Sequence, residues 1–200
     1  LKIGIPSAFQ YSLFAFANLF VQSSVNSFDH ILVEGNSAAA NADPLVYDMM
    51  AAFYTACSSF IAQNFGARKK KRILQTYLIC LFYSFITSLV LGVGIYLARY
   101  PFLYLFTSDK AVVEAGITRL SIMALSYSAS AFMDASIAAS RGLGKTAVPT
   151  FVVVMGSCVF RIIWIYTIFA YFHTIQSLYI LYVFSWGITA IAENIYFFHV

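Results

Sequence analysis

Residues 59–72 read SFIAQNFGARKKKR, and this stretch decides the fold of the chain. An apolar run ends in a Gln-Asn pair, turns at Gly66 and continues into five consecutive basic residues, Arg68 to Arg72. These five carry almost half of the positive charge of a chain that has 12 Lys and Arg residues. Short loops rich in Lys and Arg resist translocation and stay on the cytoplasmic side of a membrane. The stretch therefore predicts a cytoplasmic hairpin between two membrane-spanning helices.

The composition of the whole chain agrees with a membrane protein. Hydrophobic residues make up 61% of the 200 residues, and charged residues only 10%. A soluble domain carries about 25% charged residues because it must cover its surface with them, so an ordinary soluble domain is excluded. Cys57, Cys80 and Cys158 lie inside apolar runs without metal-ligand spacing. We therefore expect buried thiols, with neither a disulfide framework nor a metal site.

Segments long enough to cross a bilayer recur along the sequence. A membrane helix needs about 20 apolar residues. Six segments satisfy this: residues 3–28, 44–63, 73–98, 112–140, 149–172 and 176–200. The sequence thus predicts an all-α polytopic membrane protein in which residues 1–200 form one six-helix unit. Asp43 is expected to cap the helix that opens with Pro44, and Ser108 or Asp109 to cap the fourth helix.

The distribution of basic residues predicts the topology. With six spans, Lys2, residues 68–72, Arg141 and Lys145 fall on one side, whereas Arg99, Lys110 and Arg119 fall on or near the other. Because the side richer in Lys and Arg stays inside, we expect both chain ends in the cytoplasm and a location in the plasma membrane, of the bacterial inner-membrane type. The basic cluster is interpreted as a topological anchor near lipid headgroups rather than a nucleic-acid site.

Catalytic motifs are missing from the sequence. Residues 142–146, GLGKT, resemble the end of a phosphate-binding loop, but that pattern requires a glycine at position 139, which is alanine here. Neither the HExxH nor the GxSxG pattern occurs. We therefore expect no enzymatic activity and no organic cofactor.

Ionisable residues within the apolar segments are the first candidates for function. A charged side chain at the centre of a membrane helix costs about 2.5–3.5 kcal/mol on insertion scales, so it must face protein or water. Asp48, Asp134, Arg161 and Glu193 are in this position. A rise of about 1.5 Å per residue places Asp48 and Arg161 at matching depth, which predicts a structural ion pair between them.

Asp134 and Glu193 are expected at a similar depth near the cytoplasmic side. Two carboxylates close together in a low dielectric do not both ionise easily, so the pair predicts a proton or cation site. The alternative is that Glu193 reaches the interface and Asp134 bonds to a neighbouring Ser or Tyr. Asn18, Gln22 and Asn26 follow one face of the first helix. Such a polar stripe predicts the wall of a water-filled cavity.

Five stretches together resemble one lobe of a multidrug and toxic compound extrusion (MATE) transporter. They are LKIGIPSAFQ (1–10), AQNFGA (62–67), LFTSD (105–109), SRGLGKTAVP (140–149) and FRIIWIY (160–166). The Gln-Asn-x-Gly-Ala turn followed by basic residues, with Arg-Gly-x-Gly and Pro two helices later, is fairly specific as a combination. The form of the turn and the cytoplasmic start resemble the C-terminal lobe.

The resemblance implies a twelve-helix antiporter of two six-helix lobes in the lipid bilayer. Its partner is an N-terminal lobe of the same polypeptide, and no nucleic acid is involved. It implies export of amphipathic or cationic organic compounds in exchange for H⁺ or Na⁺. Asp134 matches a carboxylate that some members carry in the helix before the Arg-Gly turn, but the carboxylate that they place in the first helix of this lobe is missing. A lipid-linked oligosaccharide flippase of related architecture is the alternative, and Arg161 is one cationic residue that it would use.

Overall fold

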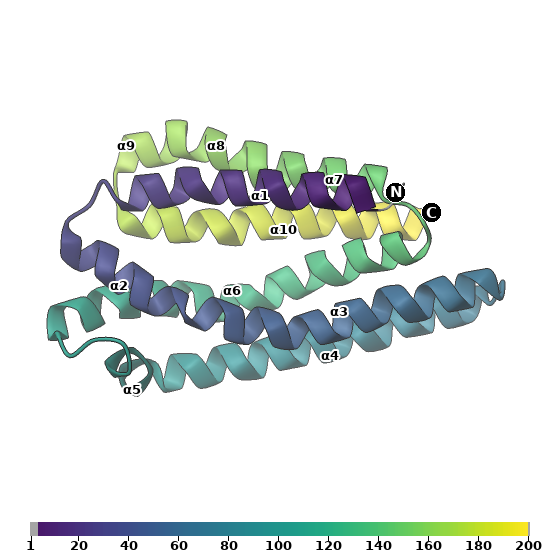
Figure 1. Cartoon of the computed structure of the whole chain (residues 1–200), viewed down its shortest axis with the longest axis horizontal. Coiled ribbons are helices and arrows are strands. Elements are labelled where there is room, and N and C mark those ends of the chain that lie inside the picture. Colours follow the sequence, from purple (N-terminus) through teal and green to yellow (C-terminus); the bar gives the residue numbers. More distant parts are fainter. Residues whose placement is uncertain (1–3, 200) are drawn as a thin grey trace.

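The computed structural model describes residues 4–199, apart from the side chains of Pro6 and Ser7, and every regular element in this part of the chain is a helix (Figure 1). Lys2 lies outside the described residues. The elements are α1 (Gly4–Val25), α2 (His30–Ala40), α3 (Ala42–Gly66), α4 (Lys70–Leu97), α5 (Arg99–Tyr104), α6 (Lys110–Gly142), α7 (Ala147–Val153), η1 (Val154–Val159), α8 (Phe160–Trp164), η2 (Ile165–Phe169), α9 (Ala170–Phe172) and α10 (Ile175–His199).

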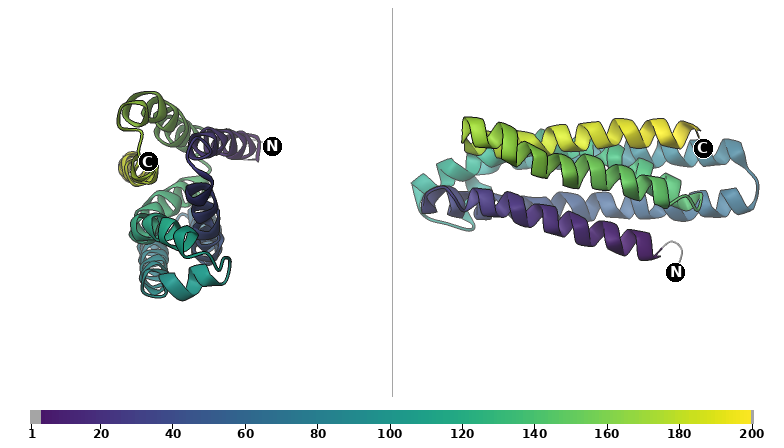
Figure 2. Two further views of the ribbon diagram at one scale, coloured as in Figure 1. Left: turned by 90° about the vertical axis from the view of Figure 1, so that its left-hand side faces the viewer. Right: turned by 90° about the horizontal axis from the view of Figure 1, so that it is seen from above.

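The helices form two groups that share α6. In Figure 1, α1 and α10 lie beside the continuous rod made of α7, η1, α8, η2 and α9, which we call the fifth rod. The other group contains α2, α3 and α4 (Figure 1). The view along the bundle in Figure 2 separates the two groups clearly. Helix α6 contacts α2, α3 and α4 on one side and α10 on the other, so it joins the groups into one unit.

Five helical stretches of the described chain are long and apolar enough to cross a membrane. They are His30–Gly66, Lys70–Leu97, Lys110–Gly142, Ala147–Phe172 and Ile175–His199. The remaining expected span, α1, is a helix of 22 residues but is not among these five. Glutamine, asparagine and serine residues interrupt its apolar sequence. The all-α membrane architecture is thus confirmed.

The helix predicted from residue 44 is α3, which begins at Ala42, but the prediction missed the separate helix α2 that precedes it. The chain is already helical from His30, and Asp29 caps this helix by accepting a hydrogen bond from the backbone nitrogen of Leu32 at 2.9 Å. Gly35 lets α2 approach α6 closely, since a Cβ atom there would lie 2.8 Å from the carbonyl oxygen of Val112. Three alanines then favour helix up to the break at Asn41. The stretch that looked like a loop is therefore a packed helix.

The predicted helix caps had different outcomes. Asp109 caps α6 by accepting from the backbone nitrogen of Ala111, as expected. Asp43, expected to be a cap, lies inside the first turn of α3, where its carboxylate accepts from side chains of α6 instead. The α3–α4 turn, the α6–α7 turn and both described chain ends lie at one end of the bundle, opposite α5 (Figure 1). This arrangement agrees with the predicted grouping of basic residues.

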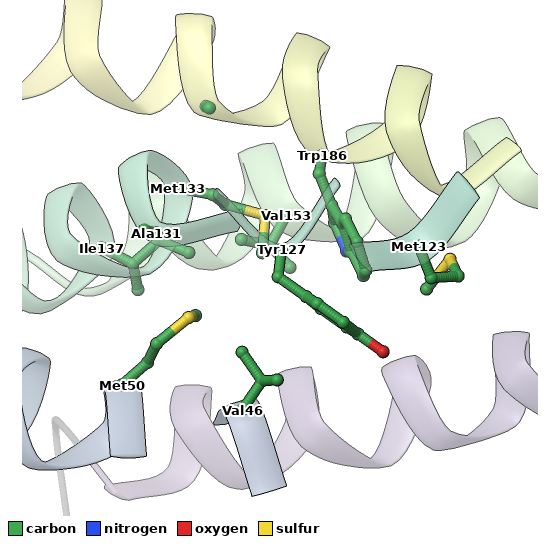
Figure 3. Close-up of a cluster of buried hydrophobic side chains, with 10 residues drawn as sticks. Val46, Met50, Met123, Tyr127, Ala131, Met133, Ile137, Val153 and Trp186 are labelled. Carbon is green, nitrogen blue, oxygen red and sulfur yellow. The ribbon is translucent and has the colours of Figure 1, made fainter. Parts of the chain in front are cut away.

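A buried cluster joins α3, α6, the fifth rod and α10 at the centre of the lobe (Figure 3). Val46 and Met50 of α3 point toward Tyr127 of α6, and Trp186 of α10 reaches the same ring from the other side (Figure 3). The rings of Tyr127 and Trp186 are 6.4 Å apart between centroids. This cluster holds both helix groups against α6 and forms part of the floor of the cavity described below.

The fifth rod contains two π-helical segments, Val154–Val159 and Ile165–Phe169. The short α8 between them carries Arg161. Each π turn contains an extra residue and changes the direction in which the following side chains point, and such turns are frequent at functional sites. The position of Arg161 between two π-helical segments makes this region a candidate functional site.

Replacing Tyr77 by phenylalanine tests the polar contact that joins α4, α6 and α10. The buried Tyr77 hydroxyl donates to Asn194 Oδ1 at 2.6 Å and lies 2.9 Å from Ser136 Oγ. We expect Tyr77→Phe to lower the free energy of unfolding by about 0.6–1.7 kcal/mol, the range for hydrogen bonds between membrane helices. Equilibrium unfolding in mixed micelles measures the change. The exposed Tyr83 of the same helix supplies the control, and a loss as large for Tyr83→Phe would contradict the prediction.

Candidate functional site

A cavity of about 340 Å³ lies between α1, α3, α6, the fifth rod and α10. Its walls are rich in aromatic side chains: Tyr11, Phe14, Tyr47, Tyr54, Tyr182 and Trp186. Asp134 and Arg141 of α6 are charged members of the same wall. An apolar pocket with a few charged groups is the usual form of a site for a small organic molecule.

A second cavity of about 310 Å³ continues from the first. Asn18, Asp43 and Tyr182 line both cavities, so they mark the junction between them. Arg119 and Gln22 lie in the wall of the second cavity alone. Together the two cavities lie beside α1 and meet at a polar junction.

Asp43 and Arg119 form the ion pair found among the described residues. Arg119 Nη2 donates to Asp43 Oδ2, and the Tyr127 hydroxyl donates to Asp43 Oδ1. Arg119 Nη1 donates to Asn36 Oδ1 at 2.8 Å. The network connects α2, α3 and α6 and lies at the junction of the cavities. The sequence does not reveal this network, because it predicts Asp43 as a helix cap and places Arg119 on or near the side of the membrane opposite the basic cluster.

The predicted ion pair between Asp48 and Arg161 is wrong. Asp48 is exposed on α3, whereas Arg161 is completely buried, with 0% of its surface exposed. The prediction rests on depth along the helix axis alone and does not include the direction in which each side chain points around that axis. Five residues, about 140° of net rotation, separate Asp43 from Asp48. Asp43 therefore faces α6, and Asp48 points away.

Arg161 is held by neutral groups instead of a carboxylate. Its Nη1 atom donates to Asn18 Oδ1 at 2.7 Å, and its Nε atom donates to Ser185 Oγ at 3.3 Å. The rings of Phe14 and Tyr182 lie 4.6 and 4.5 Å from the guanidinium carbon. The Nη2 atom is buried without a hydrogen-bond partner among the described residues.

The structure places Asp134 and Glu193 in different surroundings. Asp134 lines the first cavity, as expected of a site residue. Glu193 is 0% exposed and does not line that cavity, and neither of its oxygens has a hydrogen-bond partner in the described chain. Glu193 therefore does not reach the interface, which was the alternative considered for it. Arg141 is the charged side chain whose field acts on both carboxylates.

Two of the three polar residues expected to line a cavity do so. Asn18 lines both cavities and Gln22 lines the second. Asn26 lines neither cavity and accepts a hydrogen bond from Gln22 Nε2 at 3.0 Å. The prediction for Asn26 is wrong: this exposed residue directly follows the end of α1 at Val25, although its backbone nitrogen still donates to Gln22 O at 2.9 Å.

Gln10 is a cavity residue that the sequence analysis does not assign. Its Oε1 atom accepts from Arg141 Nη2 at 2.9 Å and from Thr150 Oγ1 at 3.3 Å. Arg141 and Gln10 both line the first cavity. Helix α1 is thus held to the rest of the lobe by two arginine–amide contacts, one at Gln10 and one at Asn18. The spacing of these amides along α1 is the signal that could have identified them.

Comparison with known proteins gives the class of this fold and site. The MatE family model matches residues 6–167, and no curated protein matches the sequence. A variant of the MATE transporter VcmN from Vibrio cholerae has a similar structure, with a TM-score of 0.85 and 19% sequence identity over 99% of this chain and 45% of that one. A second MATE structure gives a TM-score of 0.89 and 19% identity over 100% of this chain and 45% of that one.

A transporter of the MOP superfamily from Pyrococcus furiosus is also similar, with a TM-score of 0.74 and 19% identity over 98% of this chain and 42% of that one. The fold is therefore that of one lobe of a membrane transporter. The chain belongs to the MatE family. It spans less than half the length of the transporters to which it is similar.

Proposed function

We propose that the full-length transporter containing this lobe exports amphipathic organic compounds, cationic ones included, in exchange for H⁺ or Na⁺. The observation that carries the proposal is the position of Asp134 in the wall of an aromatic cavity. A carboxylate in that position can bind a proton, a small cation or the charged part of a substrate in turn. Exchange follows when these ligands compete for one group.

The aromatic wall supports the proposed substrate class. Tyr47, Tyr54 and Trp186 line the cavity that contains Asp134. Aromatic faces attract organic cations through their quadrupole and also bury apolar rings. In this proposal Arg141 modulates Asp134, because both side chains line the same cavity.

The proposal includes a partner lobe and an orientation. The similar transporters are more than twice as long as this chain, which supports a second lobe, N-terminal in the same polypeptide. The exposed basic turn between α3 and α4 supports a cytoplasmic position for that end of the bundle in a plasma membrane. The lobes would alternate access to a shared cavity by rocking against each other.

Asp134→Asn tests the proposed function. In everted vesicles that contain the full-length transporter, we expect a pH or Na⁺ gradient to drive transport of a fluorescent organic cation. We expect the asparagine variant to lose at least about 90% of this transport, because a neutral amide cannot exchange a proton or hold a cation. The gradient that supports transport identifies the coupling ion.

Asp48→Asn is the matched control for this experiment, because Asp48 is an exposed carboxylate of the same lobe. It should transport like the wild type. Folding of both variants is checked by size-exclusion chromatography in detergent. Wild-type transport rates in Asp134→Asn would place the coupling site in the other lobe and refute this part of the proposal.

A flippase for lipid-linked oligosaccharides is the second candidate function. It is favoured by three arginines in or beside the cavities, Arg119, Arg141 and Arg161, since guanidinium groups bind phosphates well. Wild-type vesicles that move no organic cation, but translocate a fluorescent lipid pyrophosphate, would establish this alternative.

A further inference from the structure

Arg161 lacks the anion that its burial requires. The guanidinium is 0% exposed, and the ion pairs of the described residues do not include it. Both of its hydrogen-bond acceptors, Asn18 and Ser185, are neutral. Removing a cation from water carries a large penalty that neutral partners offset only in part. Its Nη2 atom moreover remains without an acceptor.

Side chains around the guanidinium of Arg161 also line the two cavities. Asn18 lines both cavities, and Tyr182 does so as well. Phe14, whose ring covers the guanidinium, lines the first cavity. Of the four side chains that accept a hydrogen bond from Arg161 or stack on its guanidinium, three therefore also face a cavity. A ligand at the junction is separated from the positive charge by a single layer of side chains.

We propose that Arg161, together with Asn18, forms a binding site for an oxyanion group, a carboxylate or phosphate, carried by the transported compound. This inference rests on the proposed function and narrows its substrates to amphipathic compounds that carry such a group beside their aromatic or cationic part. The oxyanion takes the place of the Asn18 carbonyl on Nη1 and supplies an acceptor to Nη2. The exchange replaces a neutral acceptor by an anion and adds an acceptor for Nη2, and the planar fork of arginine matches a carboxylate or phosphate that binds through two oxygens.

The division of charge along the path agrees with this assignment. At the junction the charge of Asp43 is already neutralised by Arg119. In the first cavity Asp134 shares the wall with Arg141. Among the described residues, Arg161 is left as a buried cation without an ionic partner beside the junction. A zwitterionic compound can thus place its cationic part toward Asp134 and its oxyanion toward Arg161.

Two dyes that share the same aromatic ring system test the proposal. A rhodamine with a free carboxyl group and its ethyl ester share the same cationic ring system, but the ester lacks the negative charge and carries an additional ethyl group. Their dissociation constants are measured by fluorescence anisotropy on the full-length transporter in detergent, without a gradient. We expect Arg161→Gln to raise the ratio of the acid constant to the ester constant by at least about tenfold. An unchanged ratio would show that Arg161 is structural and would overturn the proposal.

Asn18→Asp provides a second variant that does not depend on removing the arginine. The new carboxylate would stand at the position of an oxygen that now lies 2.7 Å from Nη1. We expect it to pair with Arg161, to raise the Tm and to weaken binding of the acid dye relative to the ester by at least about tenfold, because the site is already filled. A lower Tm together with an unchanged ratio would contradict the proposed site.

Inorganic phosphate distinguishes the source of the oxyanion. If phosphate alone raises the Tm of the wild type but not of Asn18→Asp, while the dye ratio stays the same in all variants, a free anion occupies the site and the assignment to the transported compound is wrong. Failure of either dye to bind the wild type also overturns that assignment. Binding is measured without a gradient, so loss of gradient-driven transport alone would refute the proposed antiport and not this site.

Discussion

Asp43→Asn is expected to lower the free energy of unfolding by up to about 3–5 kcal/mol, the range for removing one partner of a buried ion pair, because Arg119 is buried and Asp43 is partly buried. Only 8% of the surface of Arg119 is exposed, so its charge would remain in the lobe without a carboxylate. The Tyr127 hydroxyl would also lose a charged acceptor. The change is measured on the full-length transporter by equilibrium unfolding in mixed detergent micelles.

Two further variants make this prediction specific. Asp48→Asn removes an exposed carboxylate from the same helix and should change the stability by no more than about 0.5 kcal/mol. The double variant Asp43→Asn with Arg119→Gln should lose less stability than the two single losses added together, because the charge left unpaired is also removed. Additive losses would show that the two side chains do not interact.

Gly92→Ala is expected to destabilise the lobe by about 3 kcal/mol through overpacking between α4 and α6. A Cβ atom at Gly92 would lie only 2.0 Å from the carbonyl oxygen of Ala124. That oxygen belongs to the backbone of a long helix, so it cannot rotate away and the helices must separate. Small residues at membrane helix interfaces have this role, because close approach supplies the packing energy that lipid does not.

Gly94→Ala is the matched control for Gly92→Ala. The same methyl group at Gly94, two residues further along α4, would meet no atom within 4 Å. Alanine in a helix interior is favoured over glycine by about 0.5–1 kcal/mol, so this variant should be slightly more stable. Thermal unfolding and the elution profile of both variants give the comparison. Equal stability of the two variants would refute the close contact between α4 and α6.

The long helices could be predicted because the thickness of a bilayer sets the length of an apolar span. The bounds of α4, α6 and α10 agree with the prediction within about three residues. Helix α2, which precedes α3, could not be predicted in this way. Residues 30–40 have a mixed composition, and the close approach of Gly35 to α6, a contact distant in sequence, is part of what holds them as a packed helix.

The sequence predicts how deep the residues of the candidate site lie along their helices, but not the direction in which their side chains point around the helix axis. Asp134, Asn18 and Gln22 line cavities, because polar residues within spans must avoid lipid. The predicted partner of Arg161 is wrong, because depth along a helix axis does not give the direction in which a side chain points around that axis. The two π segments that flank Arg161 change that rotation again, and no residue pattern in the sequence indicates them.

The position of α6 has a consequence for how the protein is made. It is the least apolar of the five candidate spans, yet it is also the most buried, whereas the most apolar, α4, exposes most of its surface. Lipid therefore solvates α4, but other helices solvate α6. During synthesis α3 with Asp43 precedes α6, and α10 follows it. Stable insertion of α6 thus depends on earlier helices for a counter-ion and on a later helix for cover, which makes biogenesis of this lobe cooperative rather than sequential.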